Sequence, residues 1–145
     1  MDASNANLTL VQQQHEALNR GDVDAAAELF AEDYRNHGRQ VGRARVRAIL
    51  KDIQSTFPDV QLTILNSVVE GEWVVVRCTF SRTHRGVGRL PVNGGMLVGV
   101  QPTGMRFEVQ HIHMYQVRNG KITEHFANRD DLGMMQQLGL LPAAK

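Results

Sequence analysis

The sequence predicts an α+β fold in which N-terminal helices pack on one face of a curved, mostly antiparallel sheet. Two observations lead to this prediction. Apolar residues recur at spacings of three and four up to Phe57, and from Val60 onward the period changes to two and β-branched residues dominate. The chain has 145 residues, the length of one ordinary domain. We therefore expect a single domain over residues 1–145, with a core from about residue 8 to 141.

Three helices are expected before residue 58. The first two meet at Gly21, where Asp22 is placed to cap the second helix, which should end near Asp33. The third should run from about residue 43 to 57, because Pro58 cannot continue a helix. The apolar positions that support these helices are Leu10, Leu18, Ala25, Leu29, Val46, Ile49, Leu50 and Ile53.

Four strands are expected after the helices. They span residues 60–70, 72–84, 105–117 and 121–129, and the last two are joined by Asn119-Gly120, the strongest short signal for a hairpin turn. The glycine-rich stretch 86–104 is interpreted as a mobile loop, with a lid over a pocket as one role. A short apolar helix or turn should follow near residues 132–140.

Composition excludes several classes of function. The chain has 16 Lys and Arg against 15 Asp and Glu, a net charge of +1, so we expect no nucleic-acid partner. The first residues lack the pattern of a signal peptide, and no apolar run reaches the length of about 20 residues that spans a membrane. The single cysteine, Cys78, lies in an apolar run and is expected to be a buried, inert thiol. These features predict a cytoplasmic protein with no membrane partner.

The predicted hairpin determines which side chains share a face. If Asn119 and Gly120 form a two-residue turn, each residue before the turn pairs with the one equally far beyond it. One face then collects Val109, His111, His113 and Tyr115 opposite Asp130, Asn128, Phe126 and Glu124. The same register turns His125, Ala127 and Arg129 to the other face. A polar cluster on an inner sheet face must be hydrogen-bonded or line a pocket.

This cluster suggests acid–base chemistry. A carboxylate such as Asp130 above an apolar cavity would have a raised pKa and could act as a general base, and His113 could hydrogen-bond a substrate oxygen. The alternative is a buried polar network without chemistry. His111, His113 and Asp130 could form a metal site, but no further ligand supports one, so none is expected. His37 is either a pocket-mouth residue or a simple turn residue.

Several short motifs in this order resemble the SnoaL-like polyketide cyclases of the nuclear transport factor two-like superfamily, over roughly residues 8 to 141. The motifs are Phe57-Pro58-Asp59, Thr83-His84, Pro102-Thr103-Gly104, Ile112-His113, Gly120-Lys121-Ile122, Glu124-His125-Phe126, and Asp130 through Leu132-Gly133 to Gln137-Leu138-Gly139. The resemblance implies a cone-shaped sheet with the helices on its concave face.

The resemblance also implies a function and a site. Such cyclases use one aspartate in an intramolecular aldol condensation, without metal or organic cofactor, and Asp130 and His113 take the catalytic positions here. The substrate would be a small hydrophobic carbonyl compound, and the protein a homodimer or higher homo-oligomer through its outer sheet face. Two alternatives remain open: an isomerase, dehydratase or epoxide hydrolase, or a ligand-binding module without catalysis. The residues expected to line the pocket are Leu18, His37, Ile49, His111, Tyr115, Glu124, Phe126 and Asn128.

Overall fold

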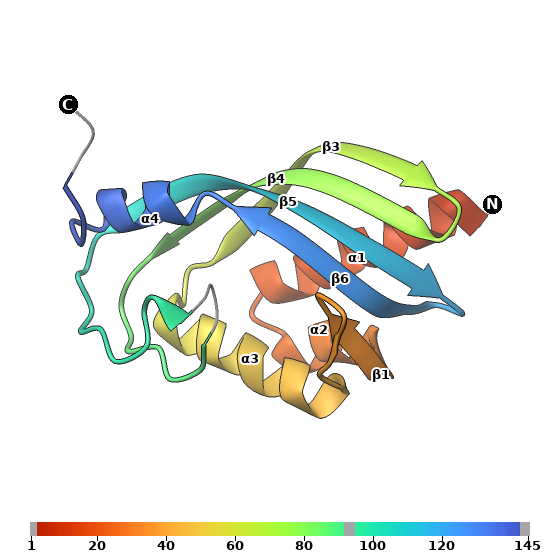
Figure 1. The fold of residues 1–145 in the computed structure, drawn as a ribbon, viewed down its shortest axis with the longest axis horizontal. Coiled ribbons are helices and arrows are strands. Elements are labelled where there is room, and N and C mark those ends of the chain that lie inside the picture. Colours follow the sequence, from red (N-terminus) through yellow and green to blue (C-terminus); the bar gives the residue numbers. More distant parts are fainter. Residues whose placement is uncertain (1–2, 92–94, 143–145) are drawn as a thin grey trace.

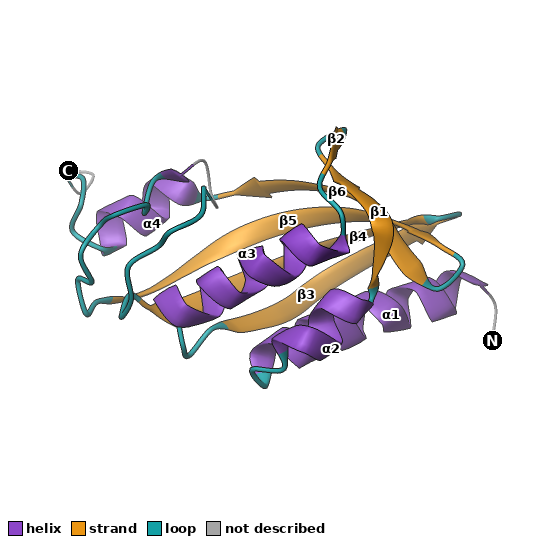
Figure 2. Ribbon diagram, turned by 90° about the horizontal axis from the view of Figure 1, so that it is seen from below, coloured by secondary structure: helices purple, strands orange, loops and turns teal. Residues whose placement is uncertain are grey.

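The computed structural model describes residues 3–91 and 95–142, which form a curved sheet covered on its concave face by helices (Figures 1 and 2). The sheet has six strands in the order β2-β1-β6-β5-β4-β3. It is antiparallel except where β1 pairs with β6. The α+β class and the position of the helices are as the sequence predicts. No helix in the described ranges is long and apolar enough to span a membrane.

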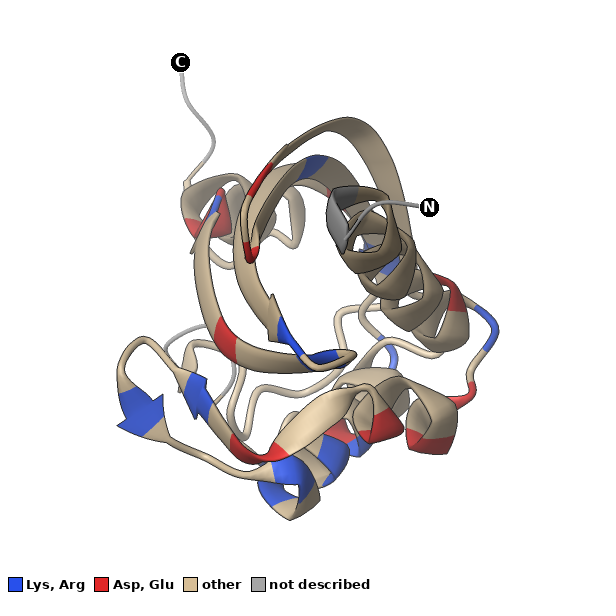
Figure 3. Ribbon diagram, turned by 90° about the vertical axis from the view of Figure 1, so that its right-hand side faces the viewer, with Lys and Arg blue, Asp and Glu red and all other residues tan. Residues whose placement is uncertain are grey.

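The three N-terminal helices are α1 (Ala3–Asn19), α2 (Val23–Glu28) and α3 (Arg43–Thr56). Gly21 adopts a φ of +80° between the first two, a value that side chains disfavour. The Asp22 side chain caps α2 by accepting a hydrogen bond from the Ala25 N–H at 3.0 Å, as predicted. Arg47 of α3 pairs with Asp24 and Glu28 of α2 at 3.2 and 3.0 Å, so acidic and basic residues of the two helices lie together (Figure 3).

The end predicted for the second helix is wrong, because the chain leaves α2 at Glu28 and enters a strand. This strand, β1 (Phe30–Asn36), runs parallel to β6, and the short β2 (Arg39–Gln40) folds back on it. The segment shows no alternation of apolar and polar residues, so nothing local marks it as a strand. Its conformation is set by pairing with β6 rather than by propensity.

The remaining strands lie within two residues of their predicted bounds. They are β3 (Gln61–Glu70), β4 (Trp73–Thr83), β5 (Arg106–Arg118) and β6 (Lys121–Arg129). The predicted turn between β5 and β6 is confirmed: Asn119 and Gly120 have φ values of +50° and +71°, and Arg118 pairs with Lys121. Both residues are in the left-handed region, as a type I′ turn requires.

The register predicted for the rest of this hairpin is wrong by one residue. Val117 pairs with Ile122, but Gln116 then pairs with Glu124, so Thr123 is an extra residue that forms a β-bulge. Beyond the bulge, every side chain of β6 lies on the face opposite to the one that the predicted register gave it. The concave face therefore receives His125, Ala127 and Arg129 in place of Glu124, Phe126 and Asn128.

The first residues of the loop between β4 and β5 are hydrogen-bonded to and packed against the end of α3. Arg85 and Gly86 both donate backbone hydrogen bonds to the Thr56 carbonyl at 3.0 Å, and a Cβ on Gly86 would lie 2.2 Å from the Ser55 carbonyl oxygen. Residues 92–94 of the loop predicted as a lid lie outside the described residues. After β6 the chain forms α4 (Asp131–Gln137), which matches the predicted short terminal helix.

Candidate active site

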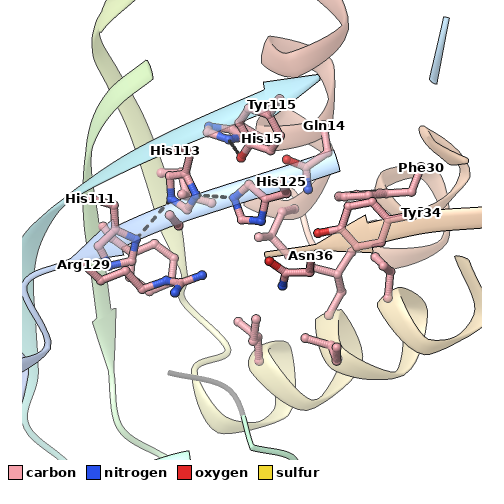
Figure 4. Close-up of a pocket in the computed structure, with 18 of the residues that line it drawn as sticks. Gln14, His15, Phe30, Tyr34, Asn36, His111, His113, Tyr115, His125 and Arg129 are labelled. Carbon is pink, nitrogen blue, oxygen red and sulfur yellow. Dashed lines mark hydrogen bonds between the residues drawn. The ribbon is translucent and has the colours of Figure 1, made fainter. Parts of the chain in front are cut away.

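A cavity of about 440 Å³ lies between the concave face of the sheet and the helices, a volume suited to a small organic ligand (Figure 4). It is lined from β5 and β6, from α1 and α3, and from β1. Six residues expected at the pocket line it: Leu18, His37, Ile49, His111, His113 and Tyr115. About half of the other lining side chains are apolar, including Phe30, Val46, Leu50, Ile53, Leu62 and Phe80.

The other predicted site residues are not among those that line the cavity. Phe126 is 37% exposed on the outer face, and Asn128, also exposed, shares that face with its partner Ile112. Glu124 accepts a hydrogen bond from the Gly38 N–H at 2.9 Å. Asp130 is exposed and its Oδ1 accepts the Gly133 N–H at 2.8 Å, which caps α4. The predicted cluster of carboxylates on the inner face is therefore wrong, because the bulge at Thr123 reverses the faces of β6.

A row of three histidines faces the cavity instead (Figure 4). Nδ1 of His111 lies 3.3 Å from Nε2 of His113, and Nδ1 of His113 lies 2.8 Å from Nε2 of His125. The side chains at 111 and 113 alternate along β5, and the bulge brings His125 of β6 to the same face. His113 uses both ring nitrogens within the row, whereas the outer nitrogens of His111 and His125 have no hydrogen-bond partner among the described residues.

The histidines of the row are neutral near pH 7. Burial lowers the pKa of His125 to about 3, with smaller effects from neighbouring cations. Burial, together with the nearby Arg82 and Arg129 guanidinium groups, lowers the pKa of His111 to about 2. The pKa of His113 is also lowered well below its usual value by burial and by its histidine neighbours. Each ring therefore carries one N–H and one lone pair.

A second polar layer supports the row from α1. Nε2 of His15 lies 2.8 Å from the hydroxyl of Tyr115, and burial lowers the pKa of His15 to about 4. The Tyr115 ring stacks on His125 with centroids 4.7 Å apart and on His113 at 5.8 Å. These contacts hold the imidazole rings in fixed orientations, as a relay of hydrogen bonds requires.

The opposite wall of the cavity comes from the unpredicted strand β1. The Tyr34 hydroxyl points into the cavity and the Asn36 amide lies at its edge (Figure 4). Burial raises the pKa of Tyr34, so its hydroxyl stays protonated and can donate a hydrogen bond. Oδ1 of Asn36 is buried without a partner among the described residues. Nε2 of His37 accepts the Ala127 N–H at 3.1 Å, which fastens this wall to β6.

The charged side chains that line the cavity are all basic. Arg45 of α3, Arg82 of β4 and Arg129 of β6 contribute to the lining, and no Asp or Glu of the described residues does. None of the three arginine side chains has an ion pair or hydrogen bond with a described residue. Among the described residues no group of three or more His, Cys, Asp or Glu side chains is placed to hold a metal ion.

Sequence reasoning missed His15, Tyr34, Asn36, His125 and Arg129 as members of the site. The first four are polar residues whose position depends on the unpredicted strand, the bulge or the packing of α1. The sequence offers one local signal for these residues, which is that Tyr34, Asn36 and His37 bring three hydrogen-bonding side chains into one short segment. No residue pattern in β6 marks Thr123 as the bulge.

Comparison with known proteins gives a consistent picture. A family model described as SnoaL-like polyketide cyclase matches residues 9–138. Aklanonic acid methyl ester cyclase DauD from Streptomyces sp. (strain C5) is 29% identical over 139 residues, which covers 91% of this chain and 81% of DauD. Nogalonic acid methyl ester cyclase from Streptomyces nogalater is 30% identical over 129 residues, which covers 85% of this chain and 90% of that protein.

Solved structures agree. TsrD from Streptomyces laurentii is 31% identical to this chain and superimposes with a TM-score of 0.79, covering 97% of this chain and 99% of TsrD. The residues 9–138 matched by the family model include all of those that line the cavity.

Proposed function

The chain belongs to the SnoaL-like polyketide cyclase family, and from this premise we propose that it is an enzyme that closes a ring in a small hydrophobic polyketide by cofactor-independent acid–base chemistry. The two curated relatives reported above are named as cyclases, which favours ring closure over the isomerase, dehydratase, epoxide hydrolase and ligand-binding alternatives. The observation that carries the proposal is the hydrogen-bonded row of histidines at the cavity wall.

A row of three neutral imidazoles supplies a base and an acid at once. Each ring has one N–H, so a row linked by two hydrogen bonds ends in a lone pair on one outer nitrogen and an N–H on the other. These outer nitrogens are Nε2 of His111 and Nδ1 of His125. When the row accepts a proton at one outer nitrogen and releases one from the other, a proton moves along each of the two hydrogen bonds. The row is then neutral again.

An intramolecular aldol reaction needs this pair of proton transfers. The lone pair at one end of the row takes the α-proton while the N–H at the other end gives its proton to the second carbonyl oxygen, so no imidazolium has to form. The developing enolate oxygen accepts a hydrogen bond from the Tyr34 hydroxyl or the Asn36 amide, and its carbon attacks the second carbonyl. One C–H bond and one C=O π bond break, one C–C and one O–H bond form, and no proton is gained or lost overall.

Within this mechanism His113 is the central member, and Asp130 has no part. The Asp130 carboxylate caps α4 and is exposed, outside the lining of the cavity. A proton transfer through it would require the end of β6 to rearrange. We therefore assign the acid–base role to the histidine row, with the outer nitrogens of His111 and His125 as the groups that meet the substrate.

The test compares two substitutions on matched substrates. The native protein, His113→Gln and Asp130→Asn are incubated with aklanonic acid methyl ester, nogalonic acid methyl ester and the corresponding free acids, and the cyclised isomers are quantified by chromatography and NMR. We expect His113→Gln to lower kcat by about 10²- to 10⁴-fold, because it interrupts the row, and Asp130→Asn to retain most of it. Loss of activity in Asp130→Asn with activity kept in His113→Gln would assign the chemistry to Asp130.

We also propose that the protein is a homodimer in the cytoplasm, with the outer face of the sheet as the interface. Val68 pairs with Val75, Val75 with Met114 and Met114 with Phe126, so an apolar row crosses four strands on this face. Contiguous exposed apolar surface of this kind marks an interaction site more often than scattered single residues do. Cys78 is buried and unpaired, and burial raises the pKa of its thiol to about 11, which supports a reducing compartment.

A further inference from the structure

We infer that Arg82 and Arg129 form an anion-binding subsite at one end of the cavity, and that the substrate of this chain carries a free carboxylate there. This inference deepens the proposed function, since it names the chemical class of the substrate. The curated relatives are named for methyl esters, in which a carboxylic acid is esterified and carries no charge. The inference therefore predicts a specificity that differs from theirs.

Arg82 is a buried cation without a counter-ion among the described residues. It is 2% exposed, lines the cavity, and its Nε has no hydrogen-bond partner. Its guanidinium carbon lies 3.2 Å from the centre of the Phe80 ring and 4.0 Å from that of Phe57, so cation–π contacts offset part of the desolvation. Aromatic faces do not satisfy N–H donors in the way that a carboxylate does, so the guanidinium beside the cavity retains unused hydrogen-bonding capacity.

Arg129 brings a second cation to the same end. It is the cross-strand partner of His111, and its guanidinium reaches into the cavity beside that ring (Figure 4). Two like charges at one end of a partly enclosed space repel each other unless an anion lies between them. Planar guanidinium groups match the geometry of a carboxylate, which they can bind through two parallel hydrogen bonds.

Neither of the two acidic residues around this pair forms an ion pair with it. Asp52 shares a small adjoining pocket with Arg82, but its two carboxylate oxygens accept backbone N–H groups of Arg89 and Leu90 at 3.0 and 3.2 Å. Asp131, at the start of α4, interacts electrostatically with both arginines without the close contact of an ion pair. The neighbouring histidines are neutral and add no negative charge.

The test is a binding measurement that does not depend on turnover. The probes are anthraquinone-2-carboxylate and two neutral counterparts of the same size, its methyl ester and its carboxamide, titrated calorimetrically into the native protein at pH 7. We expect the carboxylate to bind about ten- to a hundredfold more tightly than either neutral probe, the range expected for charge-assisted hydrogen bonds. Arg129→Gln should remove most of this preference, because it weakens binding of the carboxylate far more than binding of the ester.

Two further variants make the outcome decisive. Arg82→Met tests the second cation. If the loss of its cation–π contacts impairs folding, Arg129→Gln still decides the question, because the Arg129 side chain has no hydrogen bond or ion pair with a described residue that the substitution would break. Arg77→Gln is the matched control, since Arg77 lies on β4 as well but hydrogen-bonds Asn66 and Gln110 at 2.8 and 3.0 Å. The control should keep the full preference.

The inference is overturned by equal affinity for charged and neutral probes, by failure of the carboxylate to bind at millimolar concentration, or by a preference that survives Arg129→Gln. Its failure and that of the proposed function are separable. Cyclisation of the methyl esters with no preference for carboxylates would overturn the subsite alone. Binding of carboxylates that depends on Arg129, without cyclisation of any substrate, would overturn the enzyme assignment and keep the subsite.

Discussion

At the scale of single residues, Asp130 shows how position decides what a carboxylate does. Its Oδ1 accepts the Gly133 N–H, so its measurable contribution should be to the stability of α4. We expect Asp130→Ala to lower the free energy of unfolding by about 1 kcal/mol and Asp130→Asn to change it by a few tenths, because Asn caps helices as well as Asp. Chemical denaturation followed by circular dichroism measures both.

Asp22 provides a matched control for this prediction, since it caps α2 through the Ala25 N–H at 3.0 Å and lies far from any proposed chemistry. Asp22→Ala should lower the free energy of unfolding by a similar amount. Unchanged stability in Asp130→Ala would mean that the cap contributes nothing, and the position of this side chain would then need another explanation.

The buried histidines make the protein sensitive to acid. Their folded pKa values, about 4 for His15 and about 3 for His125, lie below the unfolded value near 6.5, so the unfolded state binds more protons between these limits. The contribution of these neutral histidines to the free energy of unfolding is therefore complete above about pH 6.5 and is lost as the pH falls toward their folded pKa values. Each such histidine should cost about 2 kcal/mol between pH 7 and pH 5, so several together can unfold an ordinary domain.

Thermal denaturation at half-unit steps from pH 7.5 to pH 5 tests this pH dependence. Tm should fall steeply below about pH 6.5 in the native protein, and His15→Gln should flatten the curve because it removes one of the groups that must charge on unfolding. A Tm that stays constant over this range would contradict the buried, neutral state of the row.

At the scale of elements, the bulge in β6 determines the content of the site. Deleting Thr123 would restore uninterrupted pairing with β5, turn His125 and Arg129 outward, and direct Glu124 and Asn128 at the cavity. We expect the deletion to lower the free energy of unfolding by more than about 3 kcal/mol, because it buries unpaired polar groups and breaks the histidine row. Urea denaturation gives the difference.

Thr123→Ala separates the extra residue from its side chain. The Thr123 hydroxyl donates to the Gln116 carbonyl oxygen at 3.2 Å, so its loss should cost only about 1 kcal/mol. If the deletion variant unfolds at the same urea concentration as Thr123→Ala, the register of β6 is not fixed by the bulge.

The same bulge explains how far the sequence could lead. Period-two strands, the Asn119-Gly120 turn, the Asp22 cap and the stop at Pro58 are local signals, and the structure contains each of these elements at its predicted place. Strand β1 depends on pairing with β6, about ninety residues away, which no local pattern encodes. The bulge lies within the β5–β6 hairpin, but no residue type near Thr123 marks it. The sequence prediction therefore put the residues of β5 on the cavity face, where the structure has them. It put the residues of β6 beyond Thr123 on the wrong face of the sheet.

At the scale of the whole molecule, the sheet separates the cavity from an outer face that carries an exposed apolar row. On the concave side the histidines and arginines gather around one partly enclosed volume. On the convex side Val68 is 67% exposed, Ile112 49%, and Phe126 37%, and the Trp73 ring lies against Phe126. An isologous contact places one such patch against its own copy, so this surface favours a twofold dimer.

This dimer can be tested without disturbing the cavity. Met114 lies in the middle of the apolar row and its side chain points away from the histidines, which occupy the alternate positions 111 and 113 of β5. Met114→Glu puts two like charges close together across a twofold interface, so it should convert the dimer to a monomer while leaving Tm and ligand binding close to native. Sedimentation velocity at micromolar concentration measures the change in mass.

Gln110→Glu is the matched control for this prediction. Gln110 is exposed on the same face of β5 but lies outside the apolar row, where it accepts a hydrogen bond from Arg77. This variant should remain dimeric. A native protein that sediments as a monomer, or a Met114→Glu variant that stays dimeric, would move the interface away from this face, and the exposed row would then need a different partner.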